Sequence, residues 1–224
     1  MPETIQFHLL WPEFLVAGLA FLVFTVDFVL PSSRSIWLAC LAATGLAVIA
    51  LVAIPGLWSV DEQMFGGLLQ IDRYAVLLKL LFLGLGVIVI LSSAEFVQKN
   101  LTHPGEFFAL IVLSVLGTLL LCSSSELLTA YISLELLSFT LYVLASYARS
   151  NPKSNEAGVK YILLGAFSSA LLLFGISLIY GTVGDTRFIE ISEVLQQQGL
   201  NVRLLLGLTF LLAGVGFKLS AVPF

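Results

Sequence analysis

Long apolar runs separated by short polar segments make up most of this 224-residue chain. A membrane-spanning helix needs about 20 mostly apolar residues. By that measure the pattern predicts seven spans, at residues 9–30, 36–54, 74–94, 106–122, 125–147, 157–180 and 203–224. The predicted fold class is all-α: a polytopic transmembrane helix bundle, with residues 1–224 forming a single domain.

The polar segments between the spans carry local signals of their own. The connection at 55–73 is acidic and rich in glycine, whereas the connection at 181–202 contains the sequence FIEISEVLQQQG. The latter predicts a short amphipathic helix that lies at the membrane surface. Ser123 and Glu126 match an S-x-x-E capping box, which predicts the start of the fifth span.

Composition supports a membrane protein and excludes several functions. Hydrophobic residues make up 59% of the chain and charged residues 11%, whereas soluble domains are about 25% charged. The net charge of −4, spread over loops, argues against a nucleic-acid partner. The sequence has no phosphate-binding glycine loop, no Cys/His metal spacing and no Ser-His-Asp arrangement. We therefore expect no cofactor and no redox chemistry on this chain.

Basic residues in the short loops predict the orientation, because cytoplasmic loops are enriched in Lys and Arg. The first, third and fifth connections contain Arg34, Lys99, Arg149 and Lys153, and the opposite side contains Arg73, Arg187 and Arg203. We therefore expect the loop at 149–153 to be cytoplasmic and the N-terminus to lie outside. The first apolar segment lacks a basic leader, so it is interpreted as an uncleaved span.

One carboxylate lies in the middle of the fifth span, within YISLELLSFTLYVLASY. At 3.6 residues per turn, Tyr131, Glu135, Ser138, Tyr142 and Ser146 share one stripe, and Leu137, Leu141 and Leu144 lie opposite. Because a charge at the bilayer centre is costly, Glu135 should face a helix bundle or a wet cavity. This span therefore predicts a functional carboxylate, with Leu137, Leu141 and Leu144 on the lipid side.

Charges near the ends of other spans have a simpler interpretation. Lys79 is expected to extend along its helix to the interface, and Lys160, in the first turn of the sixth span, could do the same. Glu13 and Asp27 are interpreted as interfacial anchors near the two ends of the first span.

Lys218 is too deep in the seventh span to reach the interface easily, since it lies about 21 Å along the helix from Leu204. It shares a face with Gly207, Leu211 and Gly214, which are mostly small residues of the kind found where helices approach closely. Pro223 cannot donate a backbone hydrogen bond and predicts a break in this helix. A broken helix beside a charge is typical of ion and substrate sites in transporters.

Three segments resemble a known family. LELLSFTLYVLASY, SNEAGVKYILLGAFSSALLLFGISLIYG and GFKLSAVPF are similar to the antiporter-like N subunit of bacterial respiratory complex I, the proton-translocating NADH:quinone oxidoreductase. Chloroplast and cyanobacterial subunit 2 are relatives. The resemblance implies an antiporter-like inverted-repeat fold of fourteen helices, of which this sequence, ending at Phe224, contains the first part and lacks the second repeat.

The resemblance also implies residue roles. Glu135, Lys160 and Lys218 correspond to the family's proton-relay residues, coupled to electron transfer from NADH to quinone elsewhere in the complex. We expect Glu135 and Lys218 to form an electrostatically coupled pair, close directly or through water. NADH, FMN, iron–sulfur clusters and quinone are expected on partner subunits, and the partners are the other membrane-arm subunits in a bacterial inner membrane. Alternatives remain: an Mrp-type cation/proton antiporter subunit, a membrane-bound hydrogenase subunit, or a non-conducting structural fragment.

Overall fold

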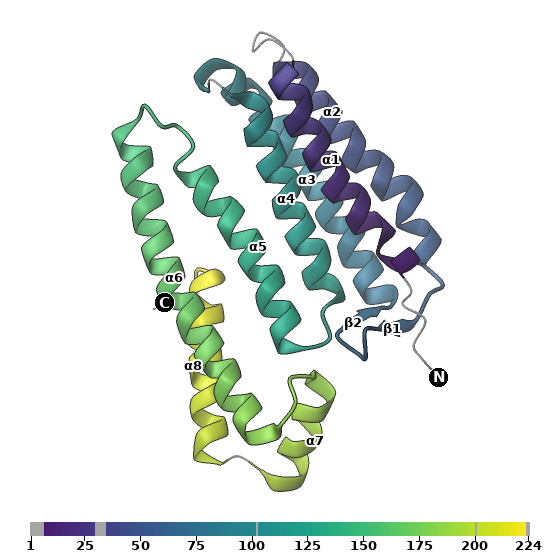
Figure 1. The fold of residues 1–224 in the computed structure, drawn as a ribbon, viewed down its shortest axis with the longest axis vertical. Coiled ribbons are helices and arrows are strands. Elements are labelled where there is room, and N and C mark those ends of the chain that lie inside the picture. The colour runs from purple at the N-terminus through teal and green to yellow at the C-terminus, as the bar shows by residue number, and fades with distance from the viewer. Residues whose placement is uncertain (1–6, 30–34, 102, 200, 223–224) are drawn as a thin grey trace.

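A computed structural model describes residues 7–29, 35–101, 103–199 and 201–222 (Figure 1). The helices are α1 Trp11–Val29, α2 Ser35–Val48, α3 Arg73–Asn100, α4 Pro104–Ser123, α5 Leu127–Ala145, α6 Pro152–Val183, α7 Phe188–Gln198 and α8 Val202–Lys218. Strands β1 Glu62–Met64 and β2 Leu69–Ile71 pair as an antiparallel hairpin. Short non-α helical turns occupy Phe7–Leu10, Ile49–Ala53 and Pro55–Leu57.

The predicted spans correspond to these helices, with adjusted ends. Within the described ranges, six helical segments are long and apolar enough to cross a membrane. α3 and α6 are longer than predicted, at 28 and 32 residues. α8, the predicted seventh span, has 17 residues, which is at the lower limit for crossing the hydrocarbon core.

α8 ends directly after Lys218, earlier than the predicted limit of the span at residue 224. Ser220 adopts a left-handed backbone with φ of 52°. The amide of Ser220 donates to the carbonyl of Phe217, and the amide of Ala221 donates to that of Gly216. These two bonds form a Schellman motif, which terminates a helix by satisfying its last carbonyls. Pro223, the predicted break, lies outside the described residues.

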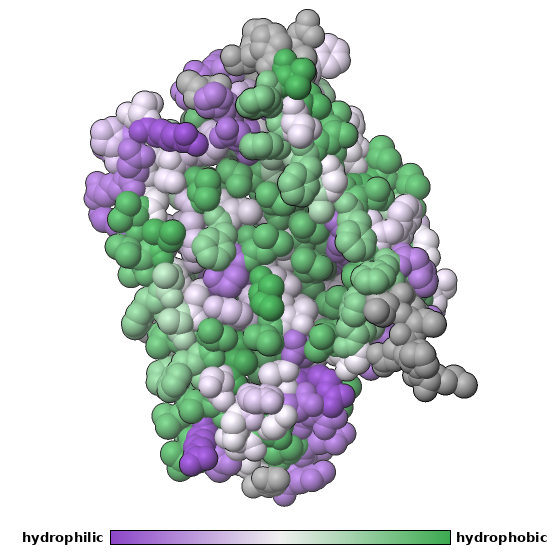
Figure 2. Space-filling model, in the orientation of Figure 1, coloured by the Kyte–Doolittle hydropathy of each residue, from purple (hydrophilic) through white to green (hydrophobic). Residues whose placement is uncertain are grey.

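The helices form two groups joined by α5 (Figure 1). α1 to α4 pack around the main core, α5 packs against α4 and α6, and α8 runs along α6. α7 is the predicted amphipathic helix and lies at the end of the bundle that also carries the β-hairpin. We call this end the hairpin side. Figure 2 shows apolar side chains across the middle of one face, with hydrophilic side chains gathered mainly towards its two ends.

The connection at 55–73 contains a hairpin that the sequence interpretation missed. Met64, Leu69 and Ile71 are buried while their strand neighbours are not, which is the alternation of a strand with one face on a core. Gly66 and Gly67 both have positive φ, a conformation that glycine adopts without steric cost and that the turn between the strands requires.

The predicted capping box at the start of α5 is wrong. Ser123 is the last residue of α4, and the N-cap of α5 is Glu126, whose side chain accepts from the amide of Thr129. The S-x-x-E spacing therefore spans the end of one helix and the start of the next.

α6 and α8 approach closely through glycines, as the small-residue face of α8 predicted. A Cβ built on Gly175 of α6 would lie 2.7 Å from both the carbonyl oxygen of Gly207 and the amide nitrogen of Leu211. A Cβ on Gly214 would lie 2.9 Å from the carbonyl oxygen of Ser168. Backbone atoms cannot move away as a side chain can, so this contact requires glycine and fixes α8, with Lys218, against α6.

We predict that Gly175→Ala lowers the stability of the folded protein by about 1–3 kcal/mol, the usual effect of overpacking. Gly181→Ala, in the same helix, is the matched control, because nothing lies within 4 Å of its Cβ position and alanine favours a helix. Melting temperatures in lipid nanodiscs compare the two variants. Equal melting temperatures would contradict the close α6–α8 contact.

Candidate functional site

Glu135 of α5 and Lys218 of α8 form an ion pair within the membrane-spanning part of the bundle. Lys218 Nζ lies 2.8 Å from Glu135 Oε1, and the exposed fractions of the two side chains are 10% and 17%. The two residues are 83 positions apart in the chain, and α8 packs mainly along α6 with little backbone contact to α5. The ion pair is therefore a direct side-chain link between α5 and α8.

Two hydroxyl groups complete the pair. Lys218 Nζ donates to Ser138 Oγ at 2.7 Å, and Ser169 Oγ of α6 donates to Glu135 Oε1 at 2.6 Å. Both bonds to Glu135 therefore reach the same oxygen, Oε1. Its other oxygen, Oε2, receives no hydrogen bond from the described residues, so one carboxylate oxygen is open to a proton while the other is held by the pair.

Lys218 lines a cavity of about 410 Å³. Its polar lining includes Lys218, Ser138, Tyr142 and Tyr161, and most of the rest is apolar side chains of α3, α4, α5 and the end of α8. Glu135 is not in this lining and lies behind Lys218, next to Ser169. The ammonium group is therefore the member of the pair that borders this cavity.

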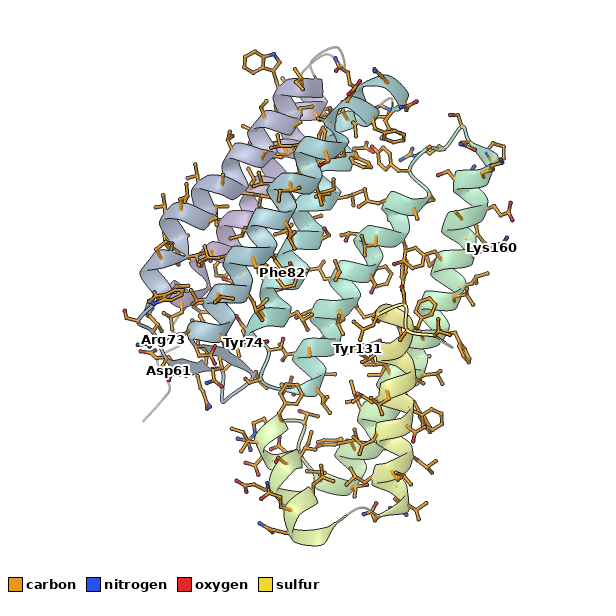
Figure 3. All side chains as sticks on the ribbon, turned by 180° about the vertical axis from the view of Figure 1, so that it is seen from behind. Asp61, Arg73, Tyr74, Phe82, Tyr131 and Lys160 are labelled. Carbon is orange, nitrogen blue, oxygen red and sulfur yellow. The ribbon has the colours of Figure 1, made fainter. Side chains whose placement is uncertain are left out.

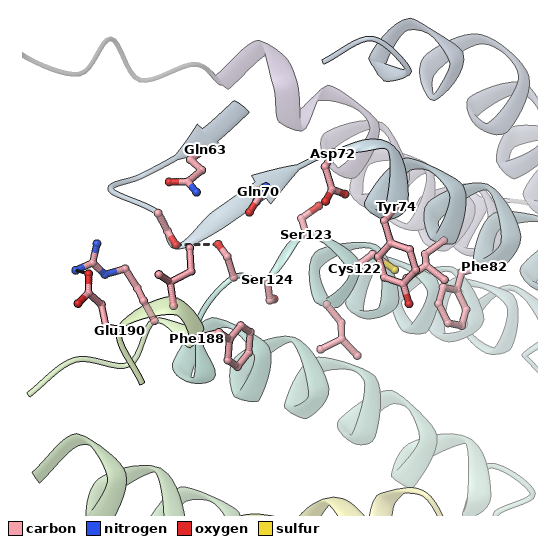
Figure 4. A pocket seen from close by; sticks show the side chains of 16 residues that line it. Gln63, Gln70, Asp72, Tyr74, Phe82, Cys122, Ser123, Ser124, Phe188 and Glu190 are labelled. Carbon is pink, nitrogen blue, oxygen red and sulfur yellow. Dashed lines mark hydrogen bonds and ion pairs between the residues drawn. The ribbon is translucent and has the colours of Figure 1, made fainter. Parts of the chain in front are cut away.

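A second cavity, of about 550 Å³, opens on the hairpin side (Figure 4). Gln63, Gln70, Asp72, Arg187 and Glu190 line it with polar groups, and we call it the hairpin-side cavity. Phe82 of α3, which Figure 3 shows on the side of α3 towards α5, lines both cavities, as does Leu121. The two cavities are therefore separated by apolar side chains.

The predicted polar stripe of α5 lies mostly inside the protein. Ser138 and Tyr142 are buried, and Tyr131 and Glu135 are half-buried. The predicted lipid face is wrong in part, because Leu144 packs on the main core and the backbone of Leu137 lies against Gly117 of α4. The most exposed residues of α5 are Ile132 and Phe139. The prediction assumed one protein-facing side of α5, whereas α5 packs against α4 on one side and against α6 on another.

The structure does not bring Lys160 to this pair. Its side chain is 69% exposed and forms an i,i+4 ion pair with Glu156. Figure 3 shows it on the outer side of α6. α6 begins at Pro152, earlier than the predicted start of the span, so Lys160 lies more than two turns into the helix on its exposed face.

Lys79 and Glu13 are a correction to the sequence interpretation. Lys79 is fully buried instead of reaching the interface, and its Nζ lies 2.6 Å from Glu13 Oε1. The signal was present in the sequence: Ala75, Leu83 and Gly86 share a buried face with Lys79, and Glu13 precedes Val16 and Ala20 on the buried face of α1. Helical periodicity therefore placed both charges towards the core.

Ser169 was also missed. It lies in an otherwise apolar run of α6 and is buried. In such a run, a serine more often donates to the carbonyl four residues earlier, so sequence alone gives no reason to assign it to Glu135.

Glu126 fixes the start of α5, nine residues before Glu135, to the loop before α7. Its carboxylate accepts hydrogen bonds from Thr129 and Thr186, and the amide of Leu127 donates to the Thr186 carbonyl. Burial opposes ionisation of Glu126, but these hydrogen bonds outweigh it and lower its pKa below the ordinary value. Folding is therefore linked to the ionised form.

A carboxyl group with a depressed folded-state pKa stabilises the fold above its unfolded-state pKa, and this stabilisation is lost as pH falls through the folded-state value. We predict that Glu126→Gln destabilises the protein at pH 7 and that the difference from wild type shrinks as pH falls below the ordinary carboxyl pKa of 4.5. Thermal unfolding at several pH values measures it. Glu95→Gln, at an exposed site, is the control, and a pH-independent effect of Glu126→Gln would contradict the linkage.

Comparison with known proteins finds that this chain is similar to membrane subunits of respiratory complexes. Residues 124–224 match the family model described as NADH:quinone oxidoreductase/Mrp antiporter, TM. NADH-quinone oxidoreductase subunit N of Trichlorobacter lovleyi is 35% identical over 224 residues, covering 99% of this chain and 46% of that protein. Subunit N of Moorella thermoacetica is 41% identical, covering 97% and 45%. The chain spans about half the length of these relatives.

Solved structures of respiratory membrane complexes also match this chain. A chain of respiratory complex I from Thermus thermophilus with bound aureothin matches with a TM-score of 0.74 and 28% identity, over 95% of this chain and 45% of that chain. An archaeal membrane-bound sulfane sulfur reductase matches with a TM-score of 0.69 and 20% identity, over 93% and 44%. At 20% identity, the second match supports a shared fold and nothing more specific.

Proposed function

We propose that the chain is a member of the NADH-quinone oxidoreductase subunit N family and works as a membrane-arm subunit of a proton-pumping NADH:quinone oxidoreductase, as its similarity to subunit N proteins supports. The observation that supports this role is the Glu135–Lys218 ion pair beside a cavity. Charged residues inside a membrane bundle are typical of proton and ion pathways. On this proposal the bundle lies in a bacterial inner membrane, and NADH, FMN, iron–sulfur clusters and quinone bind to other subunits.

The pair can act as an electrostatic switch. At an effective dielectric constant of about 20, unit charges about 4 Å apart interact by about 4 kcal/mol, which is roughly three orders of magnitude in proton affinity. When the pair is closed, Lys218 keeps its proton. When Glu135 is protonated or moves to another partner, Lys218 releases a proton into the cavity that it lines.

The Schellman turn after Lys218 supports the same role. The backbone leaves the helix at Leu219 and Ser220, and both residues line the cavity beside the ammonium group. Irregular backbone within a membrane is tolerated where it lines a cavity. The interrupted end of α8 therefore lies in the wall of the same cavity that the lysine lines.

Only the family resemblance supports a role for Lys160 in the proton relay, because its exposed side chain lies outside the Glu135–Lys218 pair. An Mrp-type antiporter subunit or a hydrogenase subunit is the rival function, since the family model includes antiporters. The identities to subunit N favour the oxidoreductase. Co-purification with NADH- and quinone-reacting subunits, or with hydrogenase subunits, separates these functions.

We predict that Glu135→Gln and Lys218→Ala, in the full-length subunit within its complex, strongly reduce proton translocation while the complex still assembles. Each removes one charge of the switch. Glu135→Asp retains the charge and should keep part of the activity. The measurement is the number of protons translocated per NADH oxidised in membrane vesicles.

Lys99→Ala is the control, because Lys99 lies at the exposed end of α3 and pairs only with its i,i+4 neighbour Glu95 among the described residues. Lys160→Ala tests the third relay residue in the same assay. Wild-type coupling in both Glu135→Gln and Lys218→Ala would reject the switch and favour a structural role for the chain.

We also propose that the loop between α5 and α6 is cytoplasmic and that the hairpin side faces outward. The loop and the hairpin lie at opposite ends of the bundle in Figure 1, so one measurement orients both. Asn151→Cys in a variant without native cysteines should react with a membrane-impermeant thiol reagent only from the cytoplasmic face. Reaction only from the outer face would reverse the orientation.

A further inference from the structure

A second Glu–Lys pair lies inside the α1–α4 bundle. Glu13 Oε1 and Lys79 Nζ are 2.6 Å apart, and their side chains are 5% and 0% exposed. Although the groups are close, they are not aligned as a hydrogen bond, and neither carboxylate oxygen of Glu13 nor the ammonium of Lys79 has a hydrogen-bond partner among the described residues. By contrast, the Glu135–Lys218 pair is supported by two serine hydroxyls.

The pair lies near the hairpin side of the membrane. Lys79 is six residues into α3 from Arg73, or about 9 Å along the helix, and Glu13 is in the first turn of α1 at the same end. The wall of the hairpin-side cavity includes Leu78, next to Lys79, and Ser123, whose buried hydroxyl also makes no hydrogen bond among the described residues. The pair is therefore close to the hairpin-side cavity, through Leu78 and Ser123.

Stability alone gives no reason for two charges at this place. Removing a carboxylate and an ammonium from water is costly for each ion, and their attraction offsets the cost only when further hydrogen bonds satisfy both groups. Those bonds are missing for Glu13 and Lys79. Apolar residues of similar volume would serve packing equally well or better, so the charges point to a role in chemistry.

We propose that Glu13 and Lys79 form a second proton-exchanging pair, which takes up and releases protons on the hairpin side of the membrane. This inference rests on the proposed function in proton translocation. A proton from the cavity converts the Glu13 carboxylate into an acid and breaks the ion pair. Lys79 then releases its own proton, and the neutral amine takes the proton of the acid, which restores the ion pair. One proton enters and one leaves in each cycle.

Two variants separate proton exchange from a structural role. Lys79→Arg keeps the positive charge beside Glu13, but a guanidinium does not give up its proton in a protein. The double variant Glu13→Gln/Lys79→Met removes both charges and leaves no buried ion without a partner. Both are made in the full-length subunit within its complex, and proton translocation per NADH oxidised is measured in vesicles, with assembly checked separately.

We expect both variants to assemble and to lose a large part of proton translocation. The matched controls are Lys99→Arg and Glu95→Gln/Lys99→Met, which make the same changes in an exposed pair and should leave translocation unchanged. Wild-type translocation in either test variant would overturn the proposal. Failure of both to assemble would also overturn it, because the pair would then be needed for folding.

Glu135→Gln, measured in parallel, distinguishes the two proposals. If Glu135→Gln loses translocation and both changes at the Glu13–Lys79 pair do not, the second pair is structural and the proposed function stands. If Glu135→Gln also keeps full translocation, the proposed function itself is wrong.

Discussion

A lysine ammonium in an apolar membrane bundle needs a counter-charge within reach, and the position of α8 depends on this requirement. Lys218 finds its partner on α5, a helix with which α8 otherwise makes little backbone contact. The glycine contact with α6 brings α8 to the right depth, and the ion pair joins it to α5. Packing and charge therefore act on different neighbours of the same helix.

This division suits a pair that has to open and close. The α6–α8 contact is backbone against backbone and cannot adjust easily, whereas the link to α5 consists of side chains that can move. Ser138 and Ser169 hold the closed state from α5 and α6. The start of α5 is anchored by Glu126, so Glu135 can change partner without a shift of its whole helix.

The sequence predicted the fold well because membrane spans are defined by long apolar runs. It also predicted that Glu135 faces protein and that Lys218 lies on a close-packing face, since both follow from helical periodicity. The ion pair confirms the expectation that these two residues meet, which came from their opposite charges and the family resemblance, because helical periodicity alone cannot relate residues 83 positions apart. The hairpin at 62–71 and the helix end at Lys218 were missed because each depends on backbone conformations at Gly66, Gly67 and Ser220.

Errors in the interpretation of charged residues have one common cause. Lys79 and Glu13 lie near the ends of their spans, where interfacial positions are usual, but both lie on a buried helix face. The face decides burial inside a bundle of several helices, because an end residue on the inner face is covered by neighbouring helices. The helix face also explains why the side chain of Lys160 is exposed, since Lys160 lies on the outer side of α6.

The central claim is that Lys218 and Glu135 form a direct ion pair that links α8 to α5. Solid-state NMR on the full-length subunit in lipid can measure the separation between the labelled Lys218 Nζ and the labelled carboxyl carbon of Glu135. The Nζ–Oε1 distance of 2.8 Å predicts strong dipolar coupling, and this coupling should be absent from Glu135→Gln samples labelled in the same way. No detectable coupling in the wild type, at any pH where the fold is intact, would contradict the account.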